Sequence, residues 1–96
     1  MLFTARVTDR VIVIHHVADY DAWRQHFDAA LPLRKAGGEG AFEVLRSDSE
    51  PDLVVHCADW SSLEDARAFF ESPEVQAIRD RAGVESPTFL YLTSEP

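Results

Sequence analysis

The sequence has little that would form a disulfide, bind nucleic acid or cross a membrane. Its 96 residues include one cysteine, Cys57, which excludes an intrachain disulfide and a zinc site of several thiolates. Lys and Arg number 9 against 17 Asp and Glu, and the formal charge of -8 argues against nucleic acid and anionic membrane surfaces as partners. No apolar run approaches the roughly 20 residues of a membrane-spanning helix. We therefore expect a cytoplasmic protein.

The composition that remains is that of an ordinary globular chain, with 46% hydrophobic residues. We predict a single domain over residues 1–96, in which residues 1–10 are an N-terminal extension or the start of the first strand. A core of this size is thin, so dimerisation would help to stabilise it.

The first predicted helical segment follows the first strand. Asp19 is placed to cap it, and apolar residues follow at helical spacing: Tyr20, Trp23, Phe27, Ala30 and Leu31. Pro32 lacks an N–H, so the helix should kink or restart there. Gly37 and Gly38 should end the segment.

The second predicted helical segment covers residues 62–81. Ser61 and Glu64 have the spacing of a capping box at its start. Ser72 and Pro73 form a second start signal, and Gly83 is the expected stop. The apolar side consists of Leu63, Ala66, Phe69, Phe70, Val75, Ile78 and Ala82.

Four segments have the composition of strands: residues 11–17, 41–47, 53–60 and 88–93. The order β-α-β-β-α-β predicts an α+β, ferredoxin-like fold, with one antiparallel sheet, both helices on one face, and the first and third strands central. Apolar residues occur in both phases of the strands, so the uncovered face would expose an apolar patch. Packing two sheets face to face in a homodimer would cover that patch.

Several motifs resemble a known group of proteins. They are "HVADYDAW" (His16–Trp23), "LRKAGG" (Leu33–Gly38), "WSSLEDARAF" (Trp60–Phe69) and "SPE" (Ser72–Glu74). Together they are similar to small bacterial members of the dimeric α+β barrel superfamily, which includes relatives of antibiotic-biosynthesis monooxygenases, stress-responsive barrel proteins and small polyketide cyclases. The resemblance implies a sheet-to-sheet homodimer and a pocket between each sheet and its helices.

The resemblance also bears on cofactors. Monooxygenase members that need no metal or flavin use a pocket tryptophan where the third strand meets the second helix, and Trp60 lies at that place. They also use polar residues such as Asn and Tyr nearby, whereas Ser61 and Ser62 follow here. Haem-degrading relatives depend on a histidine of the second helix, and residues 62–81 contain none. We therefore expect no cofactor and no bound metal.

Alternation along the strands sorts the candidate site residues, because neighbouring strand residues point to opposite faces. The family pattern places His16 on the helix side and so assigns His15 to the sheet–sheet interface. The catalytic candidates are His16 and His56. The substrate-binding candidates are Trp23, His26, Phe27, Trp60, Phe70 and Tyr91. Each also has a structural explanation as a core or helix-flank residue, while Arg34 and Arg46 are expected to be solvated or interfacial, and "GGEG" (Gly37–Gly40) a turn.

Two functions remain open. The first is a cofactor-independent enzyme, monooxygenase-like, a cyclase or an isomerase, that acts on a small aromatic or polyketide-like molecule with His16 or His56 as base. The second is a non-catalytic dimer that binds a small organic ligand or serves a stress response. No nucleophile–base pair or phosphate-binding loop in the sequence decides between them.

Overall fold

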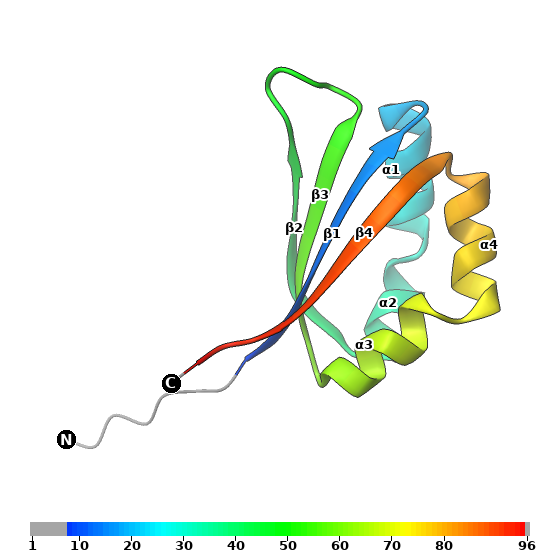
Figure 1. Cartoon of the computed structure of the whole chain (residues 1–96). Coiled ribbons are helices and arrows are strands. Elements are labelled where there is room, and N and C mark those ends of the chain that lie inside the picture. The colour runs from blue at the N-terminus through cyan, green and yellow to red at the C-terminus, as the bar shows by residue number, and fades with distance from the viewer. Residues whose placement is uncertain (1–7, 96) are drawn as a thin grey trace.

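The computed structural model describes residues 8–95, so the predicted N-terminal extension falls largely outside the described residues. The elements are β1 (Asp9–Val17), α1 (Tyr20–Ala29), α2 (Leu31–Gly37), β2 (Glu39–Arg46), β3 (Leu53–Trp60), α3 (Leu63–Phe70), α4 (Pro73–Arg81) and β4 (Val84–Thr93). The sheet is antiparallel with the order β2-β3-β1-β4, and all four helices cover one of its faces (Figure 1). The predicted α+β fold with central first and third strands is confirmed. None of the helices within residues 8–95 is long and apolar enough to span a membrane.

Each predicted helical segment consists of two short helices. The first breaks before Pro32, as predicted, because proline has no N–H for the preceding turn. Asp19 caps α1, its Oδ1 accepting from the Ala22 N–H at 3.0 Å. Gly38 ends α2 with a φ of 119°, a left-handed conformation that favours glycine. The local signals therefore place these helix boundaries correctly.

The predicted cap of α3 is wrong by one residue. The cap is Ser62, whose Oγ accepts from the Asp65 N–H at 2.9 Å. Ser61 instead extends the strand pairing, since its N–H donates to the Gly38 carbonyl at 2.9 Å. The later signals are confirmed: Ser72 caps α4, and Gly83 follows its end with a φ of 77°.

Strand β4 begins at Val84, four residues before its predicted start. It pairs with β1 on either side of a bulge, where the register shifts between Ile14 and His16. Pro87 lies in the bulged stretch and has no N–H for the ladder, while Ser86 has a φ of 47°. The irregular pairing explains why the sequence pattern revealed only the second half of this strand.

The two faces of the sheet differ in cover. On β1, Val11, Val13 and Val17 are buried against the helices. Ile12 pairs with Leu90 and Cys57 on the opposite, open face. The large hydrophobic residues most exposed among those described, Leu45, Leu90 and Leu92, lie on strands of this sheet at 40–48% exposure.

Candidate functional site

A cavity of about 70 Å³ lies between the covered face of the sheet and the helices. Five of the predicted site residues line it, from α1, β3 and α3: Trp23, His26, Phe27, His56 and Phe70. His26 is exposed, so the cavity reaches the surface beside it, whereas the other four are buried. The wall is aromatic: Trp23 stacks on Phe27 at 4.9 Å between ring centroids, and Phe27 meets the edge of His56 at 4.8 Å.

The predicted faces of the two adjacent histidines are wrong, because the structure reverses them. His15 lines the cavity, is 5% exposed and meets the Trp23 ring edge-on at 5.3 Å. His16 lies on the open face, where its Nδ1 is 3.2 Å from Asp52 Oδ2. Both phases of β1 are aliphatic, so periodicity did not decide between them. The phase that carries Val11, Val13 and Val17 is the buried one, and it carries His15 as well.

Trp60 and Tyr91 face the helices but lie beside the cavity rather than in its wall. Trp60 is 5% exposed and packs against Phe69 and Phe70 at 5.2 and 5.3 Å. Tyr91 packs near Phe89, with the Arg67 guanidinium 4.1 Å over its ring. Both side chains therefore belong to the core that supports the cavity.

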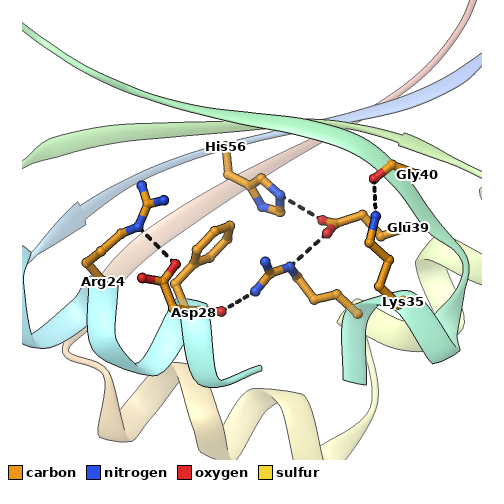
Figure 2. A network of polar contacts seen from close by, with 8 residues as sticks. Arg24, Asp28, Lys35, Glu39, Gly40 and His56 are labelled. Atoms are coloured by element: carbon orange, nitrogen blue, oxygen red, sulfur yellow. Dashed lines mark hydrogen bonds and ion pairs between the residues drawn. The ribbon is translucent and has the colours of Figure 1, made fainter. Parts of the chain in front are cut away.

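A buried polar network that the sequence did not predict links two residues of the cavity wall, Arg34 and His56, through the Glu39 carboxylate behind them. Glu39 accepts from Arg34 Nε at its Oε1 and from His56 Nε2 at its Oε2, both at 2.9 Å. Figure 2 shows the His56 ring projecting from the sheet toward this carboxylate. The three side chains are at most 5% exposed. Arg34 also donates through Nη1 to the Phe27 carbonyl and lies 3.7 Å over the Phe27 ring.

One signal in the sequence points to part of this network. Arg34 follows Phe27 by seven residues, two helical turns, so both can lie on one side of a helical segment. Glu39 belongs to β2 rather than to a turn, and its register partner is Trp60, an inward-facing residue. The expectations of a solvated Arg34 and of a turn through Gly40 were therefore wrong.

Electrostatics fixes the protonation pattern of the network. Burial raises the pKa of Glu39, but the hydrogen bonds from His56 and Arg34 and the charge of Arg34 outweigh it, so the pKa of this carboxyl is lowered. An ionised carboxylate only accepts hydrogen bonds, so His56 carries its proton on Nε2. Nδ1 is then the basic nitrogen that His56 has left for a substrate.

His15 is neutral at physiological pH. Burial, followed by the charges of His56, Arg79 and His16, lowers the pKa of His15 from 6.5 to about 4. Neither of its ring nitrogens has a hydrogen-bond partner among the described residues. Within residues 8–95, no three His, Cys, Asp or Glu side chains form a group that could hold a metal ion. The cavity wall offers imidazole and guanidinium groups, and the Glu39 carboxylate lies behind them.

Several solved structures of other proteins share the fold of this chain. SnoaB, a cofactor-independent oxygenase from Streptomyces nogalater, superimposes with a TM-score of 0.73 at 13% identity, covering 96% of each chain. A protein from Bordetella bronchiseptica assigned to the antibiotic biosynthesis monooxygenases gives 0.75 at 18% identity, covering 95% of this chain and 100% of that one. PA3566 from Pseudomonas aeruginosa gives 0.70 at 11% identity, covering 98% and 100%.

At these identities the solved structures show the fold alone. A search of curated protein sequences finds no match. The family model for antibiotic biosynthesis monooxygenases matches residues 16–81, which include α1 to α4 and both strands of the β2–β3 hairpin. The chain therefore belongs to the antibiotic biosynthesis monooxygenase family.

Proposed function

We propose that this protein is a cofactor-independent, monooxygenase-like enzyme that acts on an activated carbon of a small aromatic or polyketide-like molecule. The observation that carries the proposal is that His56 lines an aromatic cavity while its Nε2 is held by the buried Glu39 carboxylate behind it. A carboxylate that holds one imidazole nitrogen orients the ring and stabilises its protonated form. A solved relative of the same fold is described as a cofactor-independent oxygenase, which supports the reaction class.

His56, Glu39 and Arg34 have separate roles in this reaction. His56 Nδ1 accepts a proton from a carbon made acidic by a neighbouring carbonyl group or ring, and Glu39 stabilises the resulting imidazolium. Arg34 positions Glu39 through the 2.9 Å hydrogen bond. The substrate carbanion then reduces dioxygen, with the balance R₂CH₂ + O₂ → R₂CO + H₂O. One oxygen atom enters the product, and the other leaves as water with the two hydrogens of the carbon.

The size of the cavity limits the substrate and favours a second candidate function. About 70 Å³ is roughly half the 150 Å³ of an engineered cavity that accommodates benzene. A ring can enter only if wall side chains move or if part of the molecule extends past His26 to the surface. The small volume also suits a non-catalytic dimer that binds a small organic ligand, and the two candidates differ in whether His56 moves a proton.

Deuterium exchange separates proton transfer from oxygenation. An enolisable ketone with benzylic CH₂ groups, such as 2-indanone, is incubated in D₂O without oxygen, and exchange at its acidic carbon is followed by NMR. We expect wild type and His16→Ala to accelerate exchange, and His56→Asn and Glu39→Gln to lose most of that acceleration. With oxygen present, mass spectrometry should show the ketone gaining one oxygen and losing two hydrogens. Equal exchange in wild type and His56→Asn would remove His56 from the mechanism and favour the binding function.

We also propose that the open face of the sheet is covered by a second copy of the chain. Leu45, Leu90 and Leu92 leave 40–48% of their surface exposed. They lie on the side of the sheet opposite the helices, all of which pack on the other side (Figure 1). Burying apolar surface of this kind drives association, and a two-fold dimer lets one patch serve both partners.

A further inference from the structure

Three side chains in the wall of the cavity carry buried polar atoms without a partner among the described residues. These atoms are both ring nitrogens of His15, Nη2 of Arg34 and Nη1 of Arg79. Two of these residues, His15 and Arg34, are 5% and 3% exposed. An unpaired polar atom shielded from water is unfavourable, so such atoms mark a place where a ligand could supply the missing partner.

The charge of the wall favours one sign of ligand. Arg34 is matched by Glu39, whereas Arg79 has no ion pair with a carboxylate within residues 8–95. Arg79 lies 5.0 Å over the ring of Phe89, another wall residue. Burial lowers the pKa of Arg79 against the opposing charges of Asp80 and Tyr91, but a guanidinium remains protonated at neutral pH. The wall therefore carries one positive charge that no neighbouring carboxylate pairs.

The unpaired groups are mainly donors. A guanidinium donates and never accepts, so Arg34 Nη2 and Arg79 Nη1 both require an acceptor. His15, neutral because its pKa is about 4, supplies one donor and one acceptor without adding charge. A neutral hydrocarbon ring would satisfy none of these atoms, whereas an anionic oxygen would satisfy several.

We propose that the ligand of this cavity is a small organic acid in its ionised form, with its anionic oxygen bound by Arg79 together with Arg34 or His15. The proposal rests on the function proposed above, in that it names the chemical class of the molecule that occupies the same cavity. The aromatic side chains Trp23, Phe27 and Phe70 contact the carbon skeleton. The anionic oxygen lies at the Arg79 side of the cavity and His56 at the β3 side.

Binding to matched anions and neutral analogues tests the proposal. Propionate is compared with propionamide, and benzoate with benzamide, because each pair has nearly the same shape and differs in charge. Dissociation constants come from NMR titration of the full chain at neutral pH. A charge-assisted hydrogen bond is worth about 1.5–3 kcal/mol, so we expect the anion of at least one pair to bind about tenfold tighter or more. The ring resonances of His15 should shift, while those of His16, on the opposite face, should not.

A variant and its matched control locate the charge. Arg79→Met should lose the preference for the anion, about tenfold or more, because the carboxylate depends on the positive charge far more than the neutral amide does. Arg81→Met removes an exposed arginine from the same helix and should keep the preference. Equal affinity for acid and amide in wild type, or binding of neither, would overturn the proposal even if Arg79→Met does not fold.

The anion-binding experiment and the exchange experiment can fail independently of each other. Exchange of a neutral ketone that depends on His56, without any preference for anions, would overturn the anion site and leave the enzyme function standing. Selective binding of the anion without exchange that depends on His56 would support the anion site and count against catalysis.

Discussion

The charged side chains of the sheet are buried on its covered face and exposed to water on its open face. On the covered face, Arg34, Glu39 and His56 are at most 5% exposed and hold one another at 2.9 Å. On the open face, the Arg10–Asp59 and His16–Asp52 pairs leave 39–60% of each side chain exposed to water. Water competes with an exposed ion pair but not with a buried one. Removing one partner of the buried pair should therefore lower the free energy of unfolding several-fold more than removing one partner of an exposed pair. His15 and His16, one residue apart, fall on the two sides of this contrast.

The first prediction concerns dimerisation and removes apolar residues from the open face. Leu90→Glu with Leu92→Glu should turn the proposed dimer into a monomer. Each leucine that still has about 40% of its surface to bury contributes roughly 1 kcal/mol, and symmetry counts each one twice, so the double variant should lose roughly 4 kcal/mol of association free energy. Sedimentation equilibrium measures this as a fall in mass toward that of one 10.8 kDa chain. A wild type that is already monomeric would contradict the dimer.

The next effect tests the buried side. Glu39→Ala leaves the Arg34 charge buried without its carboxylate, which should lower the free energy of unfolding by about 3–5 kcal/mol in urea denaturation. Asp59→Ala is the matched control, because it removes the carboxylate of an exposed arginine pair and should cost at most about 1 kcal/mol. Similar losses in both variants would show that the two faces do not differ in electrostatic environment.

Local signals predicted more of the fold than of the site. Asp19, Pro32, Ser72 and Gly83 act within their own turn, so a short window of sequence was enough to place them. The cap at Ser61 failed because its N–H donates to a distant partner, the Gly38 carbonyl, just past the end of β3.

The site depended on contacts that no short window contains. Glu39 meets His56 across 17 positions of sequence, and its inward direction follows from the pairing of β2 with β3. The face of His15 followed from which of two aliphatic phases the helices cover, and β1 is apolar in both. The sequence therefore predicted part of the aromatic wall, Trp23, Phe27 and Phe70, and not the charged groups Arg34 and Glu39.

A smaller effect concerns pH and His15. Because folding lowers the pKa of His15 from 6.5 to about 4, the unfolded chain binds more protons between these values, and stability must fall as the pH falls through that window. The full contribution is about 3 kcal/mol, of which about 2 kcal/mol should be lost by about pH 5. The lowered pKa of Glu39 acts in the same direction, since its ionised form is the one that folding favours.

Urea denaturation at about pH 7.5 and about pH 5 measures this loss. His15→Phe removes the buried titrating group and should reduce the dependence on pH by about 2 kcal/mol, and the difference between the pH profiles of wild type and this variant isolates that group. An unchanged pH dependence in His15→Phe would contradict a neutral, buried His15.

The last prediction concerns the exposed His16–Asp52 pair and its small contribution to stability. Asp52→Ala removes the carboxylate 3.2 Å from His16 Nδ1, and the free energy of unfolding should fall by at most about 1 kcal/mol because both side chains are about half exposed. The measurement is made at low protein concentration, where the monomer dominates, and repeated at high concentration. If the proposed dimer brings a second sheet over this pair, the loss should grow with concentration, because the contact then leaves water. A loss of several kcal/mol already in the monomer would contradict the assignment of His16 to the open face.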